Sequence, residues 1–361
     1  MRLEIGVKAD MQRIGVGIIG CSPIAEVHAK ALQEISGVKL KGCSDVDLES
    51  LSRFSKQFGV AGERDYKRLV ARDDISVVII CLPHYLHRPV ALEAIDAGKH
   101  LVIEKPIALN LTEGREIINA CCRKKRLLGV VYQNRFVTAA QNLKRIITER
   151  SLGRILYAHL SVRWYRDPSY YKKRPWRSKK KEAGGGVLMV QGIHMFDLLQ
   201  WCLGEVDRVC GQVRTLFQPV EVEDWACGWI SFKNGCVADF HATTLHFPEE
   251  PAFLEFIGVK GSASLQEKRG YLSLDVNFVD EEPIRIFPSR AFESIENQDG
   301  AVPALSSTEG HRAELEDYFR ALREEKVPCV NGDEALKSLA LVEAIYESSQ
   351  NKTPITIHNH C

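Results

Sequence analysis

Two side chains in this sequence are of the types that move a proton next to a reacting carbon. Lys105 follows the short apolar run His100–Ile103, and His194 stands just after Gly192 at the start of a helical pattern. Taking a hydride from a carbinol carbon also requires removal of the hydroxyl proton and stabilisation of the developing alkoxide. A lysine can bind that oxygen, and when it is desolvated beside other cations its pKa falls, so that it can accept the proton. Histidine titrates near neutral pH and suits the same transfer, although a lone histidine is more often structural than catalytic.

A candidate dinucleotide site begins at the end of the first strand-like run. Gly20, Ser22 and Ala25 occupy the three positions of the G-x-G-x-x-G/A fingerprint, of which only the first is glycine here. Ser22 is small and can donate its hydroxyl to a phosphate, while Pro23 removes one N–H but suits a first helical turn. Ile24 belongs to the same turn and is included among the predicted cofactor contacts. The alternative interpretation is an ordinary strand-to-helix turn.

Asp45 ends the second strand-like run and strengthens the dinucleotide interpretation. A carboxylate at this place can accept hydrogen bonds from the adenosine ribose hydroxyls, and it would repel a 2′-phosphate. No arginine follows directly, since the next residues are Val46 and Asp47. The sequence therefore favours NAD over NADP. The alternative is that Asp45 only caps the helix predicted over Asp47–Phe58.

Alternating strands and helices must position these residues. Strands are predicted at Arg13–Gly20, Val38–Ser44, Val77–Leu82 and His100–Ile103, and helices at Ile24–Ser36, Asp47–Phe58, His87–Ala97 and Thr112–Lys125. Strands separated by helices of this length indicate parallel βαβ units, hence a Rossmann-like doubly wound sheet whose ligands lie at the carboxyl ends of the strands.

The pattern changes after about residue 150. Longer strand-like runs follow at Ile155–Arg166, Val206–Phe217, Asp224–Phe232, Val237–Leu245 and Ala252–Gly258, with helices at Ile193–Leu203, His311–Glu325 and Asp333–Gln350. We predict an α/β protein with two domains. Residues 1–130 form the dinucleotide-binding domain. Residues 131–361 form an α+β domain with a large, mostly antiparallel open sheet, and its last helices can pack back on the first domain. The second face of such a sheet favours a homodimer or homotetramer.

Composition excludes several classes of partner. The chain has 361 residues, a formal net charge of +1 and eleven cysteines. The balanced charge argues against nucleic acid, and the longest apolar run, Val77–Leu82, is too short for a membrane span. No secretion signal is recognisable, so we expect reduced thiols and a cytoplasmic protein. His84 and His87 alone do not make a metal site, and His358 and His360 lie in a short tail, so no metal is predicted.

Three separated motifs resemble the Gfo/Idh/MocA oxidoreductase family over nearly the whole chain. They are Cys81–His87, which matches P-x-x-x-H after a strand, Gly98–Pro106, which matches GKHV-x-x-EKP, and Gly184–Asp197, which is similar to GGG-x-L-x-[DN]-x-G-x-H-x-x-D. The resemblance implies a nicotinamide cofactor and a sugar-like substrate, with the sugar-nucleotide branch nearest. It makes Lys105 the active-site lysine and gives His194 the proton-relay or substrate-orienting role. Asp197, on the same helical face, could orient His194, and Pro106 could follow a cis bond.

The resemblance also implies the remaining contacts. Besides the turn residues and Asp45, the cofactor contacts are Leu82, Pro83, His84, His87, Glu104, Lys105, Gln133 and Asn134. The substrate contacts are Lys105, Arg135, Tyr171, Trp176, Arg177, Gln191 and His194. This chain departs from the family at Ser22, Pro23, Ala183 and Val190; an aliphatic Val190 replaces an Asp or Asn and cannot relay a proton through its side chain.

A basic loop leads into the glycine run. Residues 172–181 read KKRPWRSKKK and are preceded by Tyr170 and Tyr171. Cations interleaved with aromatic rings suit an anionic sugar derivative, with Arg177 able to pair with a carboxylate or phosphate in bidentate fashion. The alternative is a solvated charged loop.

Three functions follow from these features. The first is an NAD-dependent dehydrogenase of a sugar, sugar acid or nucleotide sugar, with Lys105 and His194 handling the proton. The second is a lyase or glycosidase-type enzyme that retains NAD and oxidises its substrate only transiently. The third is a non-catalytic ligand-binding relative, which Ser22, Pro23 and Val190 keep open.

Overall fold

The first sheet of the protein is parallel and doubly wound. A computed structural model describes residues 14–268, 271–279, 283–286 and 308–357. Its first six strands are β1 (Ile14–Ile19), β2 (Val38–Ser44), β3 (Ala61–Glu63), β4 (Val77–Ile80), β5 (His100–Ile103) and β6 (Leu128–Val130). They pair in the order β3-β2-β1-β4-β5-β6, and every pair is parallel. The order reverses at β1, between β2 and β4, which is where such sheets bind ligands.

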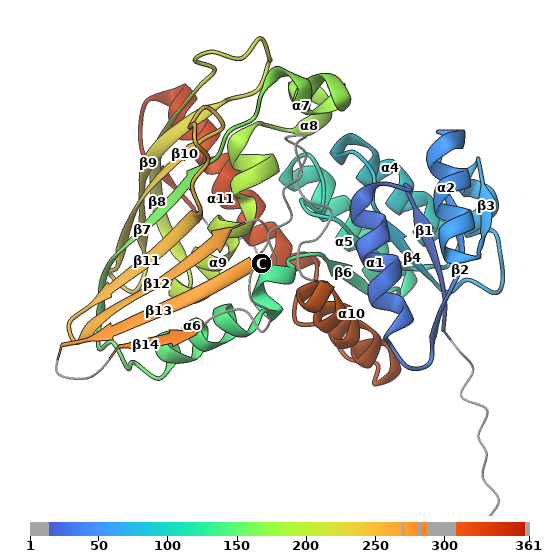
Figure 1. The fold of residues 1–361 in the computed structure, drawn as a ribbon, viewed down its shortest axis with the longest axis horizontal. Coiled ribbons are helices and arrows are strands. Elements are labelled where there is room, and N and C mark those ends of the chain that lie inside the picture. The colour runs from blue at the N-terminus through green and yellow to red at the C-terminus, as the bar shows by residue number, and fades with distance from the viewer. Residues whose placement is uncertain (1–13, 269–270, 280–282, 287–307, 358–361) are drawn as a thin grey trace, which may run out of the picture.

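The helices of this half are α1 (Pro23–Gln33), α2 (Leu48–Phe58), α3 (Tyr66–Val70), α4 (His84–Asp96) and α5 (Leu111–Lys124). They flank the sheet, as Figure 1 shows. Helix α2 begins where Asp47 caps it by accepting from the Ser50 amide, which confirms the predicted start. Helix α4 begins three residues earlier than predicted, because Pro83 occupies the N-cap and the chain turns helical at once. The elements β3 and α3 are three and five residues long, which is too short for a periodic pattern to predict them.

The second half contains one nine-stranded sheet. Its strands are β7 (Ile155–Arg163), β8 (Val206–Arg214), β9 (Trp225–Phe232), β10 (Val237–Thr243), β11 (Ala252–Gly258), β12 (Gly261–Lys268), β13 (Tyr271–Phe278), β14 (Ile284–Ile286) and β15 (Ile355–Thr356). Their order is β14-β13-β12-β11-β7-β10-β9-β8-β15. All pairs are antiparallel except β7 with β10. The predicted open, mostly antiparallel sheet is therefore confirmed.

Helices cover one face of this sheet (Figure 1). The remaining helical elements are η1 (Gln133–Phe136), α6 (Thr138–Thr148), α7 (Pro168–Lys173), η2 (Pro175–Ser178), α8 (Lys180–Ala183), the π-helix η3 (Val187–Gly192), α9 (Ile193–Leu203), α10 (Thr308–Arg323) and α11 (Gly332–Asn351). The other face exposes Tyr157, Trp229 and Val237. This is the face on which the predicted homo-oligomer would be built, and that assembly stays a prediction.

Helix α10 returns to the first half of the chain. Its apolar residues Leu315, Tyr318 and Phe319 are buried in one core with residues of α1 and the first sheet. This confirms that a C-terminal helix packs on the dinucleotide-binding half. The tail with His358 and His360 lies outside the described residues, so the structure says nothing of it.

One helical stretch of the described chain is long and apolar enough to cross a membrane. It runs from Lys180 to Leu203, and 83% of its most apolar window is buried inside the protein. Such burial is typical of a core helix. The described cysteines are free thiols.

Candidate active site

Lys105 lies at the carboxyl end of β5, on the edge where ligands of a parallel sheet bind. Its ammonium donates a hydrogen bond to the backbone carbonyl of Val190 over 2.9 Å. Burial lowers the pKa of Lys105 to about 8, with Glu104 opposing and Arg177 adding to the decrease. A lysine with such a pKa exchanges a proton near neutral pH. The peptide bond from Lys105 to Pro106 is cis, as the resemblance implied.

Val190 contributes its backbone where the family pattern has a polar side chain. It belongs to the π-helix η3, which leads directly into α9. The Val190 carbonyl of this π-helix accepts the hydrogen bond from Lys105. π-helical turns of this kind are frequent at functional sites. The departure at Val190 thus removes a side-chain proton relay and still provides an anchor for the lysine.

The glycine run needs its glycines because other groups approach its backbone closely. A Cβ on Gly186 would lie 1.9 Å from the carbonyl oxygen of Glu223, and one on Gly185 would lie 1.9 Å from the Tyr346 hydroxyl. The buried Glu223 carboxylate accepts from the amides of Gly186 and Leu188 and from the Tyr346 hydroxyl. Glu223 therefore fixes the start of the π-helix that anchors Lys105.

Replacing Gly186 with alanine should destabilise the protein severely. The new Cβ meets backbone atoms, which cannot rotate away, so we expect a loss of about 3 kcal/mol or more in the free energy of unfolding. Urea denaturation measures it. Gly192→Ala is the control, because its Cβ would meet its nearest atom only at 3.2 Å. Equal stability of the two variants would contradict the predicted clash.

His194 lies at the start of α9 and contributes a neutral imidazole. Its ring packs edge-on against Tyr132, with the ring centroids 5.8 Å apart. Burial and the charge of Lys105 hold its pKa well below the ordinary value. Its Nδ1 is buried without a hydrogen-bond partner in the described structure. A neutral imidazole beside a lysine can accept a proton or a hydrogen bond from a ligand hydroxyl.

Asp197 does not orient His194, contrary to prediction. Its two carboxylate oxygens accept from the guanidinium of Arg135, each over 2.7 Å, and one also accepts from the Ser338 hydroxyl. Arg135 is also paired with Glu334 over 3.0 Å. The Arg135 side chain is only 6% exposed. Its guanidinium donates to carboxylates on α9 and α11, so it joins η1 to these two helices. The contacts do not support the prediction that Arg135 binds substrate.

The turn after β1 has the form of a dinucleotide site. Gly20 has φ +93°, and a Cβ there would lie 2.5 Å from the Cys81 carbonyl, so only glycine fits. The Ser22 hydroxyl is buried without a partner in the described structure, at the N-cap of α1. The Asp45 carboxylate accepts from the amides of Cys21 and Asp47 over 2.7 and 2.9 Å. These residues fit a diphosphate at the helix N-terminus and a ribose at Asp45.

His84 and His87 brace the loops around this turn. His84 is buried; its Nδ1 lies 2.7 Å from the Ala183 carbonyl and its ring packs on Trp176. The ring nitrogens of His87 lie 2.8 and 2.9 Å from the carbonyls of Pro106 and Leu82. His87 is buried between these two carbonyls and thereby braces the loop after β4, and its predicted contact with the cofactor stays a prediction. Leu82 and Pro83 stand between β4 and α4, and Ile24 lies in the first turn of α1.

Glu104 lies behind Lys105 and hydrogen-bonds to His28. Its carboxylate is 2.7 Å from Nε2 of His28. Burial opposes ionisation of Glu104, yet its pKa is lowered by His28 and His311. The ligand atoms of these three residues lie within 4.8 Å of one another. Two ligand atoms of a tetrahedral zinc ion lie about 3.4 Å apart. The shorter separation between His28 Nε2 and the Glu104 carboxylate is that of a hydrogen bond, and it does not fit two ligands of a zinc ion.

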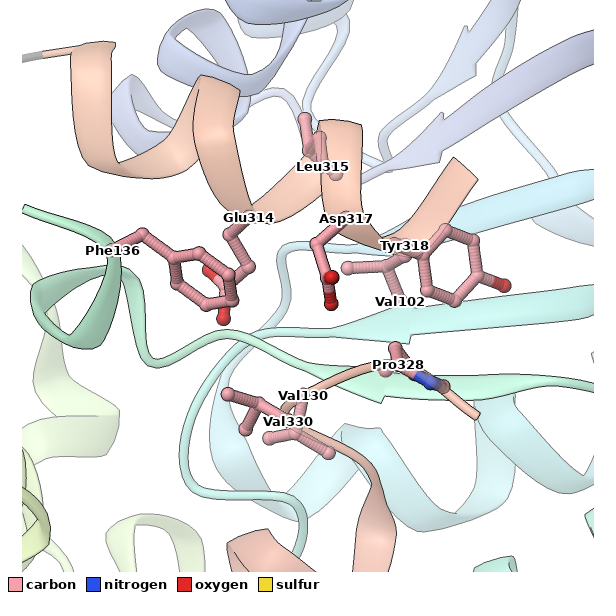
Figure 2. Close-up of a pocket in the computed structure, with 10 residues that line it drawn as sticks. Val102, Val130, Phe136, Glu314, Leu315, Asp317, Tyr318, Pro328 and Val330 are labelled. Carbon is pink, nitrogen blue, oxygen red and sulfur yellow. The ribbon is translucent and has the colours of Figure 1, made fainter. Parts of the chain in front are cut away.

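Gln133 and Asn134 begin η1, directly after β6, and Asn134 is buried. The Tyr132 amide donates to the buried carboxyl of Glu314 on α10 over 2.7 Å, which fixes the start of η1. Figure 2 shows Glu314 and Asp317 pointing from α10 toward Val130 and Val330. The cavity between them has a volume of about 10 Å³, which is far too small for a substrate.

The basic loop carries a half-buried arginine, Arg177, that forms no ion pair with a carboxylate of the described residues. The Arg177 guanidinium lies 4.4 Å from the ring centre of Tyr170 and 5.5 Å from that of Trp176. Its Nε is buried and has no hydrogen-bond partner in the described structure. Gln191, on η3, donates to the Tyr170 hydroxyl over 2.9 Å. Tyr171 is buried, with its hydroxyl 3.5 Å from that of Thr244. The loop is therefore packed against the site, and it is not simply a solvated charged loop.

Sequence reasoning missed three supporting residues of the site. Glu223 and Tyr346 hold the glycine run, and Tyr170 stacks under Arg177. The sequence places Tyr170 only beside the basic loop and assigns Glu223 and Tyr346 no role. Their partners lie far away in sequence, so no local pattern gives them.

Comparisons with known proteins agree with this geometry. Residues 14–132 match a family model described as the NAD-binding Rossmann fold of an oxidoreductase family, and residues 144–357 match the C-terminal alpha/beta domain of the same family. The chain is 25% identical to glucose-6-phosphate 3-dehydrogenase of Bacillus subtilis, covering 95% of this chain and 98% of that one. A more distant relative is 2,7-anhydro-N-acetylneuraminate hydratase of Mediterraneibacter gnavus, with 23% identity over 71% of this chain and 68% of the other.

A solved structure extends the comparison. The WlbA dehydrogenase of Bordetella pertussis, in complex with NADH and UDP-GlcNAcA, superposes with a TM-score of 0.81 at 26% identity, covering 96% of this chain and 99% of that one. Both domain models together span nearly the whole described chain. The chain is an NAD-binding oxidoreductase that belongs to the Gfo/Idh/MocA family.

Proposed function

We propose that the protein oxidises a hydroxyl-bearing carbon of an anionic sugar derivative, with Lys105 as the proton acceptor. The observation that carries this proposal is the position of Lys105, anchored at the Val190 carbonyl with a pKa of about 8. Bound NAD supplies the hydride acceptor. Lys105 binds the substrate oxygen and takes its proton, and the neutral His194 accepts a hydrogen bond from the same or a neighbouring hydroxyl.

The anionic character of the substrate rests on Arg177. Removing an arginine from water without a carboxylate partner is unfavourable, and burial lowers the pKa of Arg177, with Arg174 and Arg166 adding to the effect. A carboxylate or phosphate on the substrate would satisfy it in bidentate fashion. Two relatives have names or ligands consistent with this chemistry, a sugar phosphate in one and UDP-GlcNAcA in the other.

Matched pairs of substrates test the proposal. Glucose 6-phosphate against glucose, and a UDP-linked sugar acid against its neutral UDP-sugar, differ mainly in one anionic group. We expect NADH formation with the charged member of at least one pair, and a loss of about 10- to 100-fold in kcat/KM with the neutral member. Arg177→Leu should reduce that preference. Equal turnover of the charged and neutral members by the native protein would contradict the anionic assignment.

The rate of oxidation should rise with pH. Below its pKa of about 8 Lys105 is protonated and cannot accept the substrate proton. The kcat/KM for oxidation is therefore expected to increase about tenfold per pH unit below that value and to level off above it. Initial rates between pH 6 and pH 10 measure this. A profile that is flat across pH 8 would exclude Lys105 as the base.

A second function is favoured by one relative. The Mediterraneibacter gnavus protein is named a hydratase, not a dehydrogenase. On this alternative the substrate is oxidised only transiently and no NADH accumulates. The same Lys105 would serve, so the two functions differ in the fate of the hydride and not in the need for the lysine. The non-catalytic alternative predicts no hydride transfer at all.

A further inference from the structure

Arg174 lies at the junction of α7 and η2. It is a cation without an assigned role in the site described above. It is half-buried, and its side chain has no ion pair or hydrogen bond recorded among the described residues. Its backbone is held on both sides, since its amide donates to the Tyr171 carbonyl and its carbonyl accepts from the Arg177 amide. The side chain therefore starts from a fixed point and has no protein partner.

The loop that carries Arg174 is seated on the cofactor-binding half of the molecule. Trp176 packs against His84 at the start of α4, with ring centroids 4.7 Å apart, and the Ala183 carbonyl lies 2.7 Å from His84 Nδ1. Figure 1 shows α7 and α8 above the junction of the two halves, next to α4. Two contacts thus hold the loop beside the carboxyl ends of the parallel strands, where a dinucleotide would bind.

The charged and polar groups that act on Arg174 indicate which parts of the site lie near its guanidinium. Burial lowers its pKa, while Tyr170 and Asp45 act in the opposite direction, so both lie within electrostatic range of the guanidinium. Asp45 ends β2 and is tied to the phosphate-binding turn through the Cys21 amide. Arg174 also acts on the pKa of Arg177, on the substrate side. Arg174 is therefore within electrostatic range of Asp45, at the predicted ribose end, and of Arg177, at the predicted substrate end, and the diphosphate of a bound NAD would lie between these two ends.

The phosphate-binding turn of this chain has fewer backbone N–H donors than the usual glycine-rich turn. Arg174 can supply hydrogen-bond donors in their place. Pro23 stands in the first turn of α1, so one of the free amides of that helix end is missing. Ser22 occupies a position where glycine would let the phosphate approach the backbone, although its buried hydroxyl remains available. A turn with fewer amide donors binds a diphosphate more weakly unless another group supplies positive charge.

We propose that Arg174, in the second domain, binds the diphosphate of an NAD held by the first domain and compensates for the altered turn. The residue is a cofactor-binding residue and takes no part in the chemical step. The proposal rests on NAD as the cofactor and adds to it a cross-domain contact. A 2′-phosphate is the less suitable partner, because the Asp45 carboxylate at the ribose end repels it.

Titrations of the full-length protein with NADH, NADPH and ADP-ribose test this assignment. Arg174→Ala should lower the affinity for NADH and for ADP-ribose alike, by about 10- to 100-fold, because both ligands carry the diphosphate. Arg174→Lys should recover part of the loss. Lys173→Ala is the matched control, since Lys173 is an exposed cation of the same loop, and it should change either affinity less than about twofold.

The outcomes separate this proposal from the proposed function. Native protein that binds NADH while Arg174→Ala binds it equally well would overturn the diphosphate contact and leave the proposed function intact. A loss confined to NADPH would assign Arg174 to a 2′-phosphate and also overturn the proposal. Native protein that binds neither dinucleotide would refute the proposed function itself.

Discussion

Arginine in place of Lys105 should abolish oxidation even though the positive charge is kept. Arginine cannot give up its proton in a protein, so it can bind the substrate oxygen but cannot accept the hydroxyl proton. The structure gives Lys105 a pKa of about 8 and a fixed hydrogen bond to Val190. We expect kcat to fall by about 10²- to 10⁴-fold, which is the range of a lost general base. Initial rates of NADH formation at pH 8 measure it.

Two comparisons make this result specific. Lys105→Met removes charge and base together, so it should be at least as inactive as the arginine variant. NADH titration of both variants should show binding within a few-fold of the native protein, because the diphosphate and ribose contacts lie elsewhere in the site. An arginine variant that retained more than about a tenth of the native rate would show that another group accepts the proton.

Arg135→Ala should cost about 3 to 5 kcal/mol in the free energy of unfolding, the range for breaking a buried ion pair. Its partner Asp197 is 1% exposed and accepts from the guanidinium in bidentate fashion. Removal of the arginine leaves that carboxylate buried without its main partner. Urea denaturation gives the change, with Arg312→Ala as the control. Arg312 pairs with Glu316 at the surface, where an ion pair contributes about 1 kcal/mol or less.

The kinetics of the same variant distinguish a structural role from a substrate contact. Folded Arg135→Ala should keep the KM of the native protein for its substrate, since the guanidinium faces carboxylates of the protein. A variant of unchanged stability whose KM rises strongly would restore Arg135 to the substrate contacts expected from the family resemblance.

Much of the first domain could be predicted from the sequence, because the local residue pattern and the burial of each element in the folded protein agree. The β-branched run at Val77–Ile80 is covered on both faces, and Asp47 caps α2 through its own side chain. The strands β12 and β13 were missed. Strand β12 reads GSASLQEK, and only its alternation of buried Ala263, Leu265 and Glu267 with more exposed residues reveals its inner face. Polar residues on both faces conceal such an alternation.

The candidate site could be predicted only in part. The positions of Lys105 and His194 follow from motifs that are continuous in sequence. The partner of Asp197 does not, because helical spacing places it near His194 while the fold brings Arg135 to it from another element. The anchor at Val190 is a backbone carbonyl in a π-helical turn. A side-chain pattern carries no information about such a group.

The most direct measurement is the absorbance of NADH at 340 nm in a single turnover, with NAD-saturated protein in excess over a sugar-acid or sugar-phosphate substrate of the panel. The dehydrogenase that we propose produces NADH in an amount equal to the substrate, and the signal persists. Lys105→Arg should give no signal, while Lys173→Ala should give the native one. A signal that rises and then returns to baseline would contradict net oxidation and favour the transient chemistry of the hydratase-like alternative. No signal with any substrate of the panel would contradict the assignment of this site to the oxidation of anionic sugars.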